Sequence, residues 1–196
     1  MTDHGCFHLS REEVIRQEIE TAIDLFWSGG SLVTANLIAW AAIDLCNDIA
    51  SHRGDKTLSQ IINDTKDTVQ KRSWFGQLKK GYNQSKHGDK DPTDHVFLST
   101  EVVRLAIFQA AEDYRMCFDK LHTPMMFFQS WMYASDPAIV KPERADLVTG
   151  AITLFGKEPG MDRARGVWAA YKSNRIEFDR LMQQRLNRLS DGSRAS

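Results

Sequence analysis

The chain has 196 residues, 42% of them hydrophobic and 26% charged, which is the balance of an ordinary globular protein. This composition excludes wholesale disorder, a collagen-like repeat and a chain made only of coiled coil. Twenty-five basic against 26 acidic residues leave a net charge of −1, so no overall field selects nucleic acid, an anionic membrane or an acidic substrate. We expect one domain over 1–196, with flexible ends at 1–9 and 190–196.

Helical spacing dominates the first half of the chain. Ser10 and Glu13 form a capping box, and apolar residues then recur at intervals of three and four up to Gly29. A second helix is expected over 32–51. Its predicted core face consists of Ile38, Ala41, Ala42, Leu45 and Ile49. After a break at 52–55, weaker helical patterns follow over 58–69 and 74–85.

The second half continues in the same way. Ser99 or Thr100 is expected to cap a helix that runs to about residue 121, followed by a short, very apolar segment over 125–133. For that segment we favour a core position over an interface. Pro142 suits the first position of a helix ending near residue 155, and a last long helix is expected over 162–189. No segment alternates with period two, so the sequence predicts an all-α bundle of six to eight helices.

Charge is unevenly distributed along this pattern. Residues 161–196 hold eight basic residues against four acids, which gives +4 for the last helix and tail. Because the two signs are interleaved, a solvated helix face is the favoured interpretation. A surface for nucleic acid or an acidic partner is the alternative.

The cysteines and the apolar segments bear on the compartment. Cys6, Cys46 and Cys117 are odd in number and widely spaced, which fits neither a disulfide framework nor a cysteine zinc site. Cys46 and Cys117 are expected to be small core residues. The N-terminus has no signal-peptide pattern, and the apolar segment 32–46 is too short and too polar to span a bilayer. We therefore expect a cytoplasmic protein without a membrane segment.

One polar loop, residues 83–95, could carry chemistry. It holds two histidines and three aspartates within nine residues, and such ligands suit manganese, iron or zinc. The candidate metal ligands are His87, Asp89, Asp91 and His95. Their spacing matches no closed metal motif, and the glycine and glutamate of a calcium loop are missing. We favour the simpler interpretation, a solvated loop in which Gly88 stops a helix.

Other motifs of known chemistry are absent. The sequence has no phosphate loop, no dinucleotide fingerprint, no nucleophile elbow and no His-Glu-x-x-His.

The residues around this loop resemble a known family. A mid-chain helix that ends in Asn83-x-x-Lys86-His87 is similar to the HEPN superfamily of small helical domains. The chain more closely resembles a group of uncharacterised bacterial proteins, through Ala22-Ile23-Asp24-Leu25-Phe26 and the run from Lys86 to Pro92. The resemblance covers roughly residues 20–120. It implies an up-and-down helical core, here with added C-terminal helices, and homodimerisation through helices.

The resemblance also implies a site. HEPN ribonucleases carry an arginine, four spacers and a histidine, which places the histidine at His87, the polar position at Asn83 and the arginine at Tyr82. A tyrosine cannot clamp a phosphate as a guanidinium does, so the likeness implies binding without catalysis.

Three hypotheses follow. The first is a non-catalytic HEPN-like protein that dimerises and binds a nucleotide, RNA or a protein partner, without a cofactor. Its binding residues would be Asn83, Lys86, His87, Asp89 and Asp91, with His87 as the candidate catalytic residue if there is one, and Asp44 and Asp48 as polar neighbours. The second is a metal-dependent phosphoester hydrolase or ribonuclease that uses His87, Asp89, Asp91 and His95 with a divalent metal. The third is a nucleic-acid binder that uses the C-terminal arginines.

Overall fold

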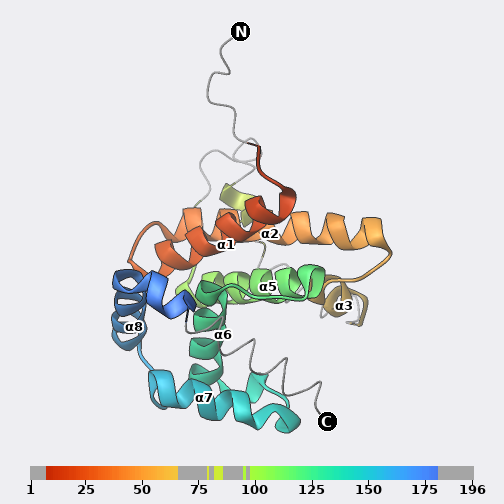
Figure 1. Cartoon of the computed structure of the whole chain (residues 1–196). Coiled ribbons are helices and arrows are strands. Elements are labelled where there is room, and N and C mark those ends of the chain that lie inside the picture. The colour runs from red at the N-terminus through yellow and green to blue at the C-terminus, as the bar shows by residue number, and fades with distance from the viewer. Residues whose placement is uncertain (1–7, 66–78, 80–81, 86–94, 96–97, 181–196) are drawn as a thin grey trace. The chain divides into compact units, whose positions relative to one another are not determined.

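The computed structural model describes residues 8–65, 79, 82–85, 95 and 98–180, and within these residues every regular element is a helix (Figure 1). The predicted all-α fold class is therefore confirmed. The chain divides into two compact units, Met1–Met125 and Met126–Ser196, which we describe separately. No change of composition marks this boundary, which falls inside a helix, so the sequence offered no sign of it.

The first unit is built on three long helices. They are α1 (Arg11–Trp27), α2 (Leu32–Arg53) and α5 (Thr100–Phe118), and each packs against the other two. The short α3 (Leu58–Thr65) packs on α2 and α5. Figure 1 shows α1 and α2 running alongside each other, with α5 next to them.

The helix ends follow the predicted signals. The Ser10 side chain accepts from the Glu13 backbone N–H while the Glu13 carboxylate accepts from the Ser10 N–H, which completes the capping box. The Ser99 side chain caps α5 by accepting from the N–H of Val102, without a return bond. Gly54 ends α2 with a φ of 77°, in the left-handed region that favours glycine.

The predicted core face of α2 is wrong. Of its five residues only Ala42 is buried, and the other four are half-buried. The buried face is offset from that stripe. It consists of Ala35, Asn36, Ala39, Trp40, Ala42, Ile43, Cys46 and Ala50. Because α2 carries apolar residues on nearly all sides, spacing alone could not identify the face that meets α1 and α5.

Helix α2 also bears on the membrane prediction. It has 22 residues and is the one described helix that is long and apolar enough to cross a bilayer. The expectation that the apolar segment is too short and too polar for a bilayer therefore does not hold for the whole helix. Its Trp40, Ile43 and Cys46 are buried against protein. A core helix of a globular protein passes the same test of length and composition.

The second unit contains most of α6 (Thr123–Ser135), the 3₁₀ turns η1 (Pro137–Ile139) and η2 (Pro142–Arg144), α7 (Ala145–Phe155) and α8 (Met161–Ser173). Met125, Phe128, Trp131 and Met132 are buried, as the core interpretation of this segment predicted. Pro142 begins the 3₁₀ turn that leads into α7.

The predicted long final helix is interrupted at Asn174. The side chains of Ser173 and Asn174 donate to the carbonyls of Ala169 and Ala170, at 3.0 and 3.1 Å, and so compete with the next helical turn. Helical structure resumes over 175–180. This break lets Phe178 contact Tyr171, with ring centroids 6.1 Å apart.

Candidate functional site

The described part of the predicted loop is small. Asn83 lies exposed in the helical residues 82–85, and His95 is exposed in an irregular segment. Lys86, His87, Asp89 and Asp91 lie outside the described residues, so the predicted metal site and most of the predicted binding site stay predictions. Among the residues that the structure describes, no group of three or more His, Cys, Asp or Glu side chains could hold a metal ion.

The helix that carries Asn83 contacts α2. The Tyr82 hydroxyl donates to Asp44 Oδ2 and Lys79 Nζ lies near Asp44 Oδ1, both at 3.4 Å. The Lys79 ammonium lies 4.7 Å from the centre of the Trp40 ring, and the Tyr82 and Trp40 rings are 5.9 Å apart. Asp44 is therefore a neighbour of the residue directly before Asn83. Asp48, the other expected neighbour, is exposed.

Tyr82 occupies the position at which the HEPN resemblance would place an arginine. Its side chain is only 8% exposed and packs on Trp40 of α2. Asn83 is the next residue and is exposed. Tyr82 therefore packs in the core of the first unit, whereas Asn83 faces solvent.

A second polar cluster, which we call the Asp113 cluster, lies inside the first unit. Asp113 of α5 is fully buried and accepts hydrogen bonds from the backbone N–H and the hydroxyl of Ser59, which lies in α3. Thr57 donates to Asn47 of α2, and the hydroxyl of Ser59 lies 3.4 Å from the Asn47 side-chain oxygen. This network joins three helices through four side chains.

The electrostatics of the Asp113 cluster make its carboxyl group easier to protonate than an exposed aspartate. Burial raises the pKa of Asp113 to about 6, although the hydrogen bonds from Ser59 act in the opposite direction. Burial also raises the pKa of Glu18, which lies on α1. Two cysteines, Cys46 and Cys117, lie close enough to Asp113 for its charge to act on both thiols.

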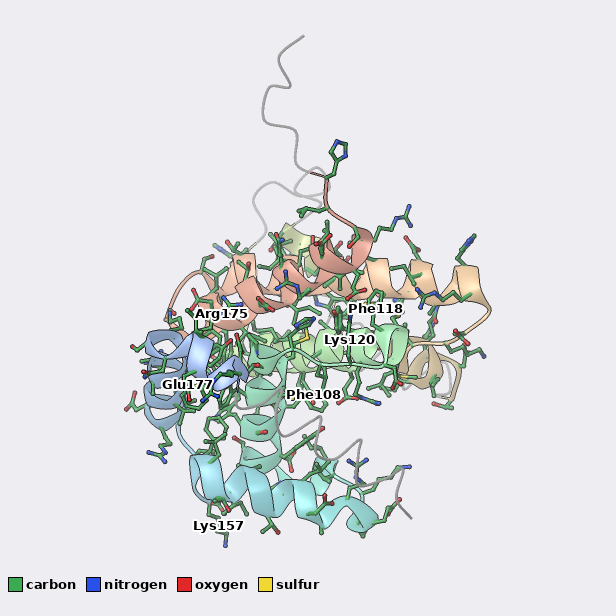
Figure 2. All side chains as sticks on the ribbon, in the orientation of Figure 1. Phe108, Phe118, Lys120, Lys157, Arg175 and Glu177 are labelled. Carbon is green, nitrogen blue, oxygen red and sulfur yellow. The ribbon has the colours of Figure 1, made fainter. Side chains whose placement is uncertain are left out.

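A third group of polar side chains lies beside the Asp113 cluster, because Tyr114 directly follows Asp113 in α5. Glu12 Oε1 lies 2.5 Å from Lys120 Nζ and 3.3 Å from the Tyr114 hydroxyl, which in turn lies 3.1 Å from His122 Nε2. Lys120, labelled in Figure 2, follows the last residue of α5, Phe118, by two positions in the chain. Burial raises the pKa of Tyr114 and lowers that of His122. Because the Tyr114 side chain is fully buried, we interpret this group as a structural tie between α1 and the end of α5.

Sequence reasoning missed the Asp113 cluster because its members are far apart along the chain. Ser59 and Asp113 are separated by 54 residues. One signal was present, since Asp113 directly precedes Tyr114 and lies three residues after Ala110, within the apolar stripe of its helix. A carboxyl group at such a position needs a buried partner.

Comparison with models of known families, with curated proteins and with solved structures finds no match to this chain.

Proposed function

We propose that this chain is a non-catalytic, HEPN-like helical protein that acts as a homodimer and binds the phosphate of a nucleotide or of RNA. The proposed binding residues are Asn83, in the helical residues 82–85, and Lys86 and His87, which follow it in the sequence. Asp89 and Asp91 of the following loop complete the set and accept hydrogen bonds from ribose or base groups.

The observation that supports a non-catalytic function is the environment of Tyr82. A HEPN-type ribonuclease would need a guanidinium here to hold the scissile phosphate. Instead, a buried phenol lies against Trp40 and donates to Asp44, a carboxylate that would repel a phosphate. Asn83 is exposed on the same turn, and the cationic or polar residues that follow it are of the kind that binds phosphate without cleaving RNA.

The first experiment measures binding of a fluorescent single-stranded RNA and of a labelled nucleotide by polarisation. Lys86→Ala and His87→Ala are each expected to weaken binding about fivefold or more, because each removes a charge-assisted contact to phosphate. Lys56→Ala is the matched control, since Lys56 is an exposed lysine that pairs with Asp64 at 2.7 Å. Equal binding by all three variants and the unmodified protein would contradict the proposed site.

Salt dependence and size complete this test. Binding through a few phosphate contacts should weaken as salt rises, with a slope that falls by about one for each lysine removed. Light scattering is expected to give the mass of two chains. If removal of C-terminal arginines, but not of Lys86, lowers the slope, the C-terminal surface is the binder instead.

A cleavage assay tests the non-catalytic part. We expect no RNA cleavage by the unmodified chain in the presence of a chelator. We also expect none by Tyr82→Arg, because the side chain of residue 82 points toward α2 and not toward the solvent that Asn83 faces. Tyr82→Phe keeps the packing on Trp40 and is the folding control. Chelator-resistant cleavage that is lost in His87→Ala would overturn the proposal. Stoichiometric divalent metal in the purified protein, with cleavage that needs it, would instead support a hydrolase.

A further inference from the structure

Cys46 and Cys117 approach each other across the contact between α2 and α5. The Cys117 thiol donates to the backbone carbonyl of Cys46 with an Sγ–O distance of 3.4 Å, which brings the two cysteines into contact. Cys46 is buried and Cys117 is half-buried. Cys117 is thus the more accessible residue of the pair, and Cys46 is shielded from solvent.

The surroundings of the two thiols differ as well. Arg53 lies beside Cys117, since its Nη1 donates to the Cys117 carbonyl at 2.6 Å and its guanidinium lies 5.7 Å from the centre of the Phe118 ring. The hydrogen bond from the Cys46 thiol lowers the pKa of Cys117, and the Arg53 charge acts in the same direction, against burial and the charge of Asp113. The same hydrogen bond and burial raise the pKa of Cys46.

This asymmetry matches the two roles in thiol oxidation. The sulfur that reacts first is the more accessible one and is stabilised as a thiolate, as Cys117 is chiefly by the hydrogen bond from Cys46 and in a smaller part by the charge of Arg53. The sulfur that reacts second needs only to lie within reach of the first, as Cys46 does.

We propose that Cys46 and Cys117 form a reversible intramolecular disulfide when the protein meets a hydroperoxide. The Cys117 sulfur attacks one oxygen of the hydroperoxide, so that an S–O bond forms and the O–O bond breaks. The departing alkoxide or hydroxide takes up the proton given up by the Cys117 thiol and becomes an alcohol or water. The Cys46 sulfur then attacks the Cys117 sulfenic acid. An S–S bond forms, the S–O bond breaks, and the hydroxyl leaves as water with the Cys46 thiol proton. This reaction does not depend on the proposed binding function.

The experiment uses the full-length chain with Cys6→Ser, which leaves the two cysteines of interest. The protein is treated with hydrogen peroxide, alkylated, digested and analysed by mass spectrometry. We expect a crosslinked pair of peptides containing Cys46 and Cys117, loss of both alkylatable thiols in the monomer, and recovery of both after dithiothreitol. Stable sulfinic acid on Cys117 without the crosslink, or two thiols that remain alkylatable after treatment, would overturn the proposal.

Single variants test the order of the two steps. In Cys46→Ala the sulfenic acid on Cys117 has no partner, so labelling by dimedone should rise several-fold over the background protein. Cys117→Ala should show no such labelling at Cys46. Arg53→Met keeps bulk near Phe118 but removes the cation, and is expected to slow disulfide formation about threefold or more. Equal labelling of both cysteines would contradict the assigned roles.

Discussion

Asp113 is the residue whose ionisation should be most visible in the stability of the protein. Its pKa is raised to about 6 by burial, so the folded protein binds a proton more tightly than the unfolded chain does. Asp113 therefore favours folding below the unfolded pKa, and this advantage is lost as pH rises from about 4 to about 6. The expected size is about 2 to 3 kcal/mol. Urea unfolding at several pH values measures it.

The variant Asp113→Asn isolates this effect. An amide can still accept from the Ser59 N–H and can donate to the Ser59 hydroxyl, but it carries no charge. We expect the variant to be at least as stable as the unmodified protein at pH 7 and to lose the dependence between about pH 4 and pH 6. Burial lowers the pKa of His122, so the folded protein loses stability as pH falls below the ordinary pKa of histidine. Both proteins carry His122, so the difference between their pH profiles removes this effect. Identical pH profiles would contradict the assignment.

At the scale of the element, the end of α2 depends on one glycine. Gly54 has a φ of 77°, and a side chain added there would meet no atom within 4 Å, so backbone strain is the whole penalty. Gly54→Ala is expected to lower the free energy of unfolding by about 1 kcal/mol. Gly166 is the matched control, because it is exposed within α8 and Gly166→Ala should stabilise by up to about 1 kcal/mol. Thermal unfolding of both variants, with opposite signs expected, checks this.

The interruption of the last helix supports a second element-scale prediction. The rings of Phe127 and Tyr171 both contact Phe178, at centroid distances of 5.9 and 6.1 Å. Phe178→Ala should therefore destabilise the second unit by about 1 to 3 kcal/mol, less than for a fully buried phenylalanine because Phe178 is half-buried. Near-ultraviolet circular dichroism during urea unfolding reports on these aromatic rings. An unchanged midpoint would show that the contacts of Phe178 contribute nothing to stability.

The elements also show how far the sequence could be interpreted. The cap and buried stripe of α1 were predictable, because one face is apolar and the other is polar. The face of α2 was not, because Ile38 and Trp40 are both apolar and only the packing partners distinguish them. At the site, Asn83 is exposed and its binding role stays a prediction. Asp44, which we expected as a polar neighbour, contacts Tyr82, but their separation of 38 residues gives no local signal of this pairing. The Cys46–Cys117 contact was missed for the same reason.

At the scale of the whole molecule, the proposed disulfide should change stability. It would join residues that are 71 apart and so restrict a large part of the unfolded chain. The chain-entropy argument predicts a gain of about 4 kcal/mol. Urea unfolding of the oxidised and reduced forms of the Cys6→Ser protein measures it, with Cys117→Ala treated with peroxide as the control. A disulfide that forms but lowers the unfolding midpoint would show that the helices must separate to make it.

The ion pair between Glu12 and Lys120 has a consequence for how the first unit could be rebuilt. It brings the start of α1 and the segment after α5 together, with 2.5 Å between the charged atoms. A short linker from residue 10 to residue 122 would therefore span little distance. New ends could be opened between Gly54 and Asp55, in an exposed connection after α2. The first unit thus has the geometry of a circularly permutable module, in which the order of the helices along the chain can change while their packing stays the same.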